Sequence, residues 1–198
     1  MTDRPAKPQL DLVSALDELS DEELMLRYCQ GQTAAFDLIV LRHRKRIYSF
    51  LLRRLRNPER AEELLSEVFL KVHRAAPRYQ PEARFTTYLF TIAYRACLNV
   101  EARLRNRRDE AVGDTEDLDV TASSAAVTLE SQTLGLGSRS PERALRTQRA
   151  VARLDAELDK LPEGQREIFL LYYREGLTIA DVAVCLDLEP SEVKGRLA

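Results

Sequence analysis

The sequence of 198 residues predicts an all-α protein made of two small helical domains joined by a flexible linker. Apolar residues recur every three or four positions through most of the chain, as they do on one face of an α-helix. No segment shows the apolar and polar alternation that is typical of a half-buried β-strand. Residues 109–139 are rich in Asp, Ser, Thr and Gly and lack aromatic residues, which indicates a linker between the domains.

The first domain is expected to occupy residues 20–108, after a mobile arm of residues 1–19 that contains two prolines. Its first helix begins at Ser20, which together with Glu23 has the S-x-x-E spacing of a capping box. Gly31 is positioned to end this helix.

The second and third helices meet at Asn57 and Pro58, which suit the N-cap and the first position of a new helix. The expected apolar stripe of the second helix is Phe36, Ile39, Val40, His43, Ile47, Phe50 and Leu51. The expected stripe of the third helix is Ala61, Leu65, Val68 and Val72. His43 is therefore interpreted as a packed core histidine.

The fourth helix is expected to start after Thr86 or Thr87 and to lose its periodicity in the basic run of residues 103–108. Its expected buried residues are Leu89, Ala93, Ala96, Val100 and Leu104. Four helices of this length make one compact module.

The second domain is expected to occupy residues 140–198 and to start with a helix at Pro141. The apolar residues of that helix are Val151, Leu154, Leu158 and Leu161, and the next helix carries Ile168, Leu171 and Tyr172 and ends at Gly176. The chain from Thr178 onward has the pattern of a helix-turn-helix, because Thr178 and Asp181 can cap a helix that a short turn at residues 187–189 ends.

The last helix is expected to begin near Pro190, with Val193 and Leu197 facing inward. The residues left facing outward are Ser191, Glu192, Lys194 and Arg196. A recognition helix presents donors and acceptors to the major groove of DNA in this way. The alternative is a plain helical hairpin in a core.

The net charge of −2 hides an uneven distribution along the chain. Residues 42–108 hold 17 Lys or Arg against 6 Asp or Glu, a balance of +11, whereas residues 109–145 hold 2 against 8, a balance of −6. Neutralising the phosphates of DNA is the simplest reason for such a concentration of arginine. The acidic stretch could lie over the basic surface and compete with DNA, an effect that salt would screen.

One sector of the fourth helix beside its apolar stripe carries Tyr88, Thr91, Arg95, Asn99 and Asn106. A ring for stacking, amides for base edges and an arginine for phosphate suit unpaired DNA. The alternative is an ordinary solvated face.

The outward face of the third helix carries Glu63, Glu67 and Leu70, with Lys71 able to relieve the repulsion between the two carboxylates. An acidic patch with an exposed leucine inside a basic domain suggests a protein partner. An ordinary surface is the alternative.

Other classes of function are not expected. No run of 18 or more apolar residues appears, so no membrane insertion is expected. The odd, widely spaced cysteines, Cys29, Cys97 and Cys185, are expected to be reduced thiols of a cytoplasmic protein and not zinc ligands. No catalytic constellation or phosphate loop appears, so neither an enzyme nor a cofactor is expected.

Together these segments resemble the extracytoplasmic function sigma factors, which are small bacterial transcription initiation subunits with only the second and fourth sigma domains. The match rests on residues 61–72 (AEELLSEVFLKV), 85–93 (FTTYLFTIA), 161–171 (LPEGQREIFLL), 175–178 (EGLT) and 193–197 (VKGRL). These segments of the two domains occur in the family's order.

The resemblance implies that the third helix docks on the clamp helices of the largest subunit of core RNA polymerase, through Glu63, Ser66, Glu67 and Leu70. It implies that the fourth helix and the loop before it hold the melted minus-ten promoter strand, through Tyr88, Thr91, Arg95, Asn99 and Arg103. It implies that the helix-turn-helix reads the minus-thirty-five duplex, through Thr178, Ser191, Glu192, Lys194 and Arg196. An anti-sigma factor is a further candidate partner.

The chain departs from the family pattern at three positions. Ser66 stands where a Gln is usual, Tyr88 replaces a frequent Trp, and Asp187 replaces a usual Gly in the turn, where Asp can adopt the left-handed conformation. Only about two helical turns follow Pro190, whereas family members continue, so either the sequence stops early or its promoter contacts are reduced. An autonomous helix-turn-helix regulator and a helical protein adaptor remain the alternative functions.

Overall fold

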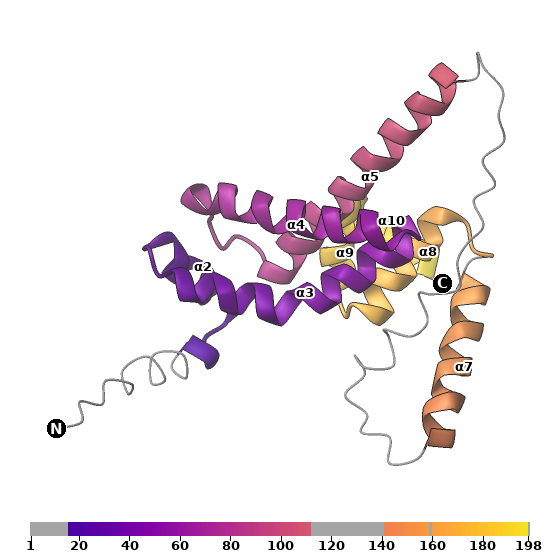
Figure 1. Cartoon of the computed structure of the whole chain (residues 1–198), viewed down its shortest axis with the longest axis horizontal. Coiled ribbons are helices and arrows are strands. Elements are labelled where there is room, and N and C mark those ends of the chain that lie inside the picture. Colours follow the sequence, from indigo (N-terminus) through magenta and orange to yellow (C-terminus); the bar gives the residue numbers. More distant parts are fainter. Residues whose placement is uncertain (1–15, 112–140, 159, 198) are drawn as a thin grey trace.

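The computed structural model describes residues 16–111, 141–158 and 160–197, and every regular element in these residues is helical (Figure 1). The first module contains α2 (Asp21–Cys29), α3 (Thr33–Leu55), α4 (Pro58–Ala75), the short 3₁₀ turn η1 (Ala76–Arg78) and α5 (Phe85–Ala111). The second part contains α7 (Pro141–Leu158), α8 (Glu163–Phe169), the π-helical segment η3 (Leu170–Arg174), α9 (Ile179–Leu186) and α10 (Pro190–Leu197). The all-α prediction is confirmed, and the expected acidic linker lies outside the described residues apart from 109–111, which continue α5.

Side-chain caps define where three helices begin, as the sequence predicts. The Ser20 hydroxyl accepts from the backbone N–H of Glu23, whose carboxylate accepts from the Ser20 N–H, so the capping box of α2 is complete. The Asn57 side chain accepts a 2.9 Å bond from the Arg60 N–H at the start of α4. Thr178 and Asp181 form the equivalent reciprocal box at α9.

The start of α5 differs from the prediction, because the helix begins at Phe85 and not after Thr86 or Thr87. The N–H of Phe85 donates to the Glu22 carboxylate at 2.6 Å. A helix start leaves its first N–H groups without intrahelical partners, and here a carboxylate from α2 satisfies one of them. This cap comes from a residue 63 positions away, so the local sequence does not reveal it.

Helices α2 to α5 pack around an apolar core, and together they make up the N-terminal module. The fully buried large side chains of this core include Leu24, Met25, Ile39, Ile47, Leu51, Val68, Val72, Phe85, Leu89 and Phe90. His43 is 5% exposed, and its Nε2–H donates to the Asp21 carboxylate at 2.7 Å, so its interpretation as a core histidine is confirmed. Burial alone would raise the pKa of Asp21, but hydrogen bonds from His43 and Arg42 outweigh it and lower that pKa.

Residues 16–19, which precede α2, are attached to α3. Leu16 is buried, and the Arg42 guanidinium donates to the carbonyl oxygens of Asp17 and Leu19 at 2.6 and 2.9 Å. The core of the N-terminal module therefore extends a few residues ahead of Ser20.

Helices α8 to α10, with η3, form the C-terminal module, whose buried apolar residues include Ile168, Leu171, Val182 and Val193. These residues belong to the same buried apolar cluster as the core of α2 to α5, because α9 packs against α5. Helix α7 lies apart from both modules in Figure 1. Leu154, on the expected apolar stripe of α7, is 48% exposed, whereas Leu158 is buried.

Candidate nucleic-acid and protein interfaces

The outward face of α4 is acidic with an apolar residue at one end. Glu63, Ser66, Glu67 and Leu70 are all exposed, while Leu64 and Val68 on the opposite face are buried. The ammonium of Lys71 lies 2.8 Å from the Glu67 carboxylate, which confirms the prediction that Lys71 can relieve the repulsion between Glu63 and Glu67. These four side chains are therefore accessible on the surface of the described fold.

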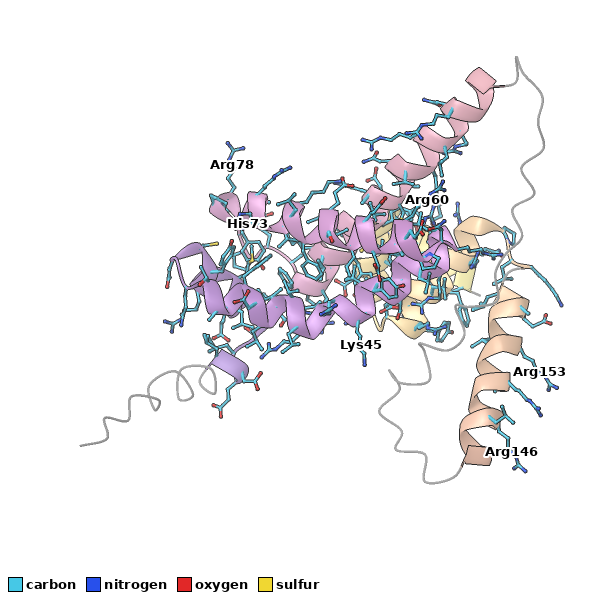
Figure 2. All side chains as sticks on the ribbon, in the orientation of Figure 1. Lys45, Arg60, His73, Arg78, Arg146 and Arg153 are labelled. Atoms are coloured by element: carbon cyan, nitrogen blue, oxygen red, sulfur yellow. The ribbon has the colours of Figure 1, made fainter. Side chains whose placement is uncertain are left out.

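A groove of about 240 Å³ separates this face from α5. Its walls carry Glu63 and Glu67 from α4, Arg103 and Arg107 from α5, and Arg60, which lies where α4 begins (Figure 2). Arg103 lies about 22 Å along the helix axis from Tyr88, at 1.5 Å per residue. The structure therefore brings Arg103 to the acidic face of α4 and not to the first turns of α5.

A cavity of about 360 Å³ lies between the loop that follows η1 and the first turns of α5. The loop contributes Tyr79, and α5 contributes Thr87, Tyr88 and Thr91. The rings of Tyr79 and Tyr88 meet edge to face with centroids 5.6 Å apart. Burial raises the pKa of Tyr88, so the phenol stays a neutral hydrogen-bonding group.

Tyr79 was not among the predicted site residues. Its hydroxyl is buried without a hydrogen-bond partner, and burial raises its pKa to about 12. A buried unpaired hydroxyl on a cavity wall is available to a polar group of a ligand. The sequence does contain a signal, since Pro77 and Pro81 bracket an aromatic residue in the loop that precedes α5. Arg78, the last residue of η1, also lines this cavity, and its side chain points away from the neighbouring helices in Figure 2.

Beyond the cavity, the predicted sector continues along α5 with Arg95 and Asn99, and both side chains are exposed. Tyr88 and Asn99 are about 16 Å apart along the helix axis, at 1.5 Å per residue. A row that runs from an aromatic ring through an arginine to an amide is suited to an extended single strand that enters the cavity with one base.

The helix-turn-helix has the predicted geometry. Asp187 adopts the left-handed conformation (φ 57°) that the turn requires. Val193 is buried against the module, and Ser191, Glu192, Lys194 and Arg196 are exposed on α10. The Arg196 guanidinium pairs with Glu192 at 2.5 Å, one turn earlier on α10. Thr178 is exposed at the start of α9.

The two modules touch through an inter-module ion cluster that the sequence did not reveal, made of Arg46, Arg53, Arg54, Glu167 and Glu175. The carboxylate of Glu175 receives a 2.8 Å bond from Arg46 Nε and another from Arg53 Nη2. Arg54 pairs with Glu167 of the other module and with Glu101 of its own at 2.8 Å. Glu175 is 5% exposed, so solvent screens its charge little. The arginines of α3 that pair with it compensate that charge.

A second set of contacts joins α5 to α9. The Thr87 hydroxyl donates to the Asp181 carboxylate at 2.6 Å, and the Thr91 hydroxyl lies 3.3 Å from the Cys185 sulfur. Burial raises the pKa of Asp181, but hydrogen bonds from Thr87 and Thr178 outweigh it and lower that pKa. Val184 of α9 completes the wall of the Tyr88 cavity.

Two kinds of site are absent from the part of the chain that the structure describes. None of its helices is both long and apolar enough to cross a membrane. Within the same residues, no three His, Cys, Asp or Glu side chains gather as metal ligands would.

Comparisons with known proteins agree with this division into two modules. Residues 39–109 match the family model of sigma-70 region 2, and residues 151–198 match that of sigma-70 region 4. The chain is 29% identical to RNA polymerase sigma-H factor of Pseudomonas aeruginosa, over 92% of this chain and 90% of that protein. It is 29% identical to ECF RNA polymerase sigma factor SigM of Mycobacterium tuberculosis, over 91% and 81%.

Two solved structures have a similar fold. CnrH in complex with the cytosolic domain of CnrY matches with a TM-score of 0.57 and 22% identity, covering 89% of both chains. The sigma factor RpoE in complex with the anti-sigma factor NepR, from Bartonella quintana, matches with a TM-score of 0.54 and 16% identity. That second match covers 82% of this chain and 89% of the other.

Proposed function

Because the chain belongs to the extracytoplasmic function family of RNA polymerase sigma factors, we propose a division of labour between its two modules in transcription initiation. The chain binds core RNA polymerase, recognises promoter DNA and assists promoter melting. The N-terminal module, with domain limits of 20–108, binds polymerase and the minus-ten element, and the C-terminal domain of residues 140–198 binds the minus-thirty-five duplex. Residues 109–139 connect them.

The exposed face of α4 is the docking surface for the clamp helices of the largest polymerase subunit. Glu63 and Glu67 supply negative charge, Ser66 a small polar contact, and Leu70 an apolar anchor that is 43% exposed. Charge complementarity of this kind speeds encounter, and the apolar anchor adds affinity when it is buried.

The cavity between Tyr79 and Tyr88 captures an unstacked base of the melted minus-ten strand. Thr91, Arg95 and Asn99 guide the strand along α5. Taking a base out of a duplex costs a few kcal/mol, which stacking on an aromatic ring at about 1–3 kcal/mol per base can offset. Arg103, which lies over the groove beside α4, contacts a phosphate or the polymerase edge, farther from the base pocket than the sequence suggests.

Helix α10 reads the minus-thirty-five duplex. Ser191, Glu192, Lys194 and Arg196 face outward from it, and Thr178 at the start of α9 is placed to contact the backbone, as the first helix of such a motif crosses it. The pairing of Glu192 with Arg196 orients the guanidinium and reduces its net charge, so Lys194 carries most of the phosphate attraction.

The protein has no active site of its own, because sigma factors direct the catalysis of polymerase. It acts where core polymerase and the promoter are, in the cytoplasm. One of the two similar solved structures holds a sigma factor with an anti-sigma factor, and the other holds CnrH with the cytosolic domain of CnrY. An anti-sigma factor is therefore a proposed partner of this chain.

The observation that carries this assignment is the pair of distinct surfaces on the N-terminal module, one acidic on α4 and one aromatic at the start of α5. Transcription from a cognate promoter with purified core polymerase tests it. We expect transcripts only when the chain is present. An autonomous regulator would bind the promoter without polymerase and would leave core polymerase inactive. A protein adaptor would bind neither duplex nor single-stranded promoter DNA.

A further inference from the structure

Helices α8 and α10 contact each other, although only α10 belongs to the helix-turn-helix (Figure 1). Gly164 occupies the second position of α8, and Arg196 lies in the last turn of α10. A Cβ atom on Gly164 would lie 2.7 Å from Nη1 of Arg196 and 3.9 Å from its Cζ. Non-bonded heavy atoms repel one another at 2.7 Å, since their best separation is about 3.5–4.0 Å. The guanidinium therefore occupies space that a side chain at position 164 would fill, and we call this space the Gly164 seat.

A second contact constrains the same guanidinium. Its Nη2 donates to the Glu192 carboxylate at 2.5 Å, one turn earlier on α10. Because Nη1 and Nη2 belong to one planar group, the pairing with Glu192 and the Gly164 seat together set the plane of that group. The Arg196 side chain is 39% exposed, so it is held against the module and still reaches solvent.

The seat depends on the missing side chain of Gly164 and not on an unusual backbone. Gly164 lies within α8 and does not have a positive φ, so its backbone is compatible with alanine. Alanine also favours a helix more than glycine does, because glycine loses more backbone freedom on folding. The atoms that an alanine side chain would displace are at the flexible end of Arg196. The substitution should therefore move the guanidinium and leave the helices in place.

A guanidinium with a fixed plane and a compensated charge suits base recognition better than phosphate attraction. The carboxylate of Glu192 offsets part of the charge of Arg196, which weakens its attraction for phosphate. An arginine in the major groove can donate two bonds to O6 and N7 of a guanine, and this pair distinguishes guanine from the other bases. A guanidinium that is already oriented loses less conformational freedom when it forms such a pair.

We infer that Gly164, which lies outside the helix-turn-helix, is a positioning residue for promoter recognition, because it seats the Arg196 guanidinium in the plane that reads one guanine of the minus-thirty-five duplex. Lys194 supplies phosphate attraction, Arg196 supplies base discrimination, and Gly164 acts on the second of these. The recognition part of this inference rests on the proposed function of α10, whereas the seat itself does not.

The first experiment examines the seat in the free full-length chain by nuclear magnetic resonance. The Nε–H resonance of Arg196, assigned by its absence from the spectrum of Arg196→Lys, reports the surroundings of the guanidinium. We expect Gly164→Ala to shift this resonance. Gln165→Ala, at an exposed neighbouring position of α8, is the matched control and should leave the resonance nearly in place. An unchanged resonance in Gly164→Ala would overturn the seat.

The second experiment measures base discrimination by the holoenzyme. Holoenzyme containing the full chain selects from promoter duplexes that are randomised only across the minus-thirty-five element, and sequencing of the bound DNA gives the enrichment of each base. We expect the wild type to enrich a guanine at one position and Arg196→Ala to lose that preference. Gly164→Ala should reduce the same enrichment about fivefold or more without changing the other positions, whereas Gln165→Ala should retain it. Equal enrichment in Gly164→Ala and the wild type would contradict the inference.

A double substitution distinguishes positioning of Arg196 from a general structural role. Adding Gly164→Ala to Arg196→Ala should cause no further loss of discrimination, because the side chain that the seat holds is already gone. A further loss would mean that Gly164 acts through another group. The slope of log K against log salt should change little in Gly164→Ala, and a decrease of about 0.9 would mean that Arg196 contacts a phosphate and not a guanine. Either of these two results would overturn the inference.

The urea midpoint of Gly164→Ala should equal or exceed that of the wild type, since alanine favours the helix. A lower midpoint would mean that the substitution disturbs the module, and it would overturn a role that acts through one side chain. Failure of this inference and failure of the proposed function are distinguishable. If the wild-type holoenzyme enriches no base in the element, the proposed role of α10 fails. If the wild type enriches a guanine and Gly164→Ala enriches it equally, only the role of Gly164 fails.

Discussion

Asp21 accepts a 2.7 Å hydrogen bond from Nε2–H of His43 and a 2.9 Å bond from Arg42, and these contacts tie the first turn of α2 to the middle of α3. We predict that Asp21→Asn lowers the free energy of unfolding by about 1.5–3 kcal/mol at pH 7, the usual range for a hydrogen bond to a charged group. Urea denaturation of the full chain measures this. Asp37→Asn, at an exposed position of α3, is the matched control and should have little effect.

The pH dependence of stability tests the same carboxylate. Its pKa is lowered in the folded protein, so its contribution is complete above about pH 3.8 and is lost as the pH falls through the folded pKa. The wild-type unfolding free energy should therefore fall more steeply below about pH 3.8 than that of Asp21→Asn. If the unfolding free energies of the two proteins fell in parallel as the pH is lowered, ionisation of Asp21 would not contribute to the pH dependence of stability.

Charge reversal at Glu67 tests the polymerase surface. Glu67→Lys places a positive charge in the acidic face of α4 and removes the pairing with Lys71. We expect the affinity for core polymerase to fall at least about tenfold, which corresponds to about 1.4 kcal/mol. Fluorescence titration with core polymerase gives the constant, and Asp37→Lys supplies the same charge change elsewhere. Equal affinity of the two variants would remove α4 from the docking surface.

Tyr88 tests the melted-strand cavity. Tyr88→Ala should weaken binding of the single-stranded minus-ten oligonucleotide to the holoenzyme by about 1–3 kcal/mol, while Tyr88→Phe should retain most of the affinity because the ring remains. Binding to a minus-thirty-five duplex serves as the internal control and should not change. If Tyr88→Ala and Tyr88→Phe lost a similar amount of single-strand affinity, the hydroxyl, and not ring stacking, would supply most of the binding.

Lys194 tests the duplex contact of α10. Lys194→Ala should weaken holoenzyme binding to the minus-thirty-five duplex and reduce the slope of log K against log salt by about 0.9, the value for one phosphate contact. Lys160→Ala removes a similar charge from outside the helix-turn-helix and should leave the slope unchanged. An unchanged slope in Lys194→Ala would mean that this side chain contacts no phosphate.

The features that the sequence predicts well are local. The caps at Ser20, Asn57 and Thr178 each involve residues within three positions, so the required groups can be seen together in the sequence. The left-handed turn at Asp187 is local as well. Helical periodicity also gives the exposed face of α4, because its buried stripe leaves only one direction for Glu63 and Glu67.

The features that the sequence does not predict depend on distant contacts. Glu175 pairs with Arg46 across 129 positions, and neither residue differs from an ordinary surface charge in its own segment. Tyr79 becomes a cavity wall only because its loop folds over α5. Periodicity shows which face of α7 is apolar, but it cannot show what covers that face, and Leu154 is half exposed.

The bond from the Phe85 N–H to the Glu22 carboxylate has a consequence for dissecting the protein into fragments. The family match for the N-terminal module begins at residue 39, inside α3 and after all of α2. A fragment cut at that boundary would lack Glu22, so the first turn of α5 would lose its acceptor and the core would lose Leu24 and Met25. The smallest autonomously folding unit around α5 should therefore start no later than Leu16, and a shorter fragment should unfold at lower urea and bind single strands poorly.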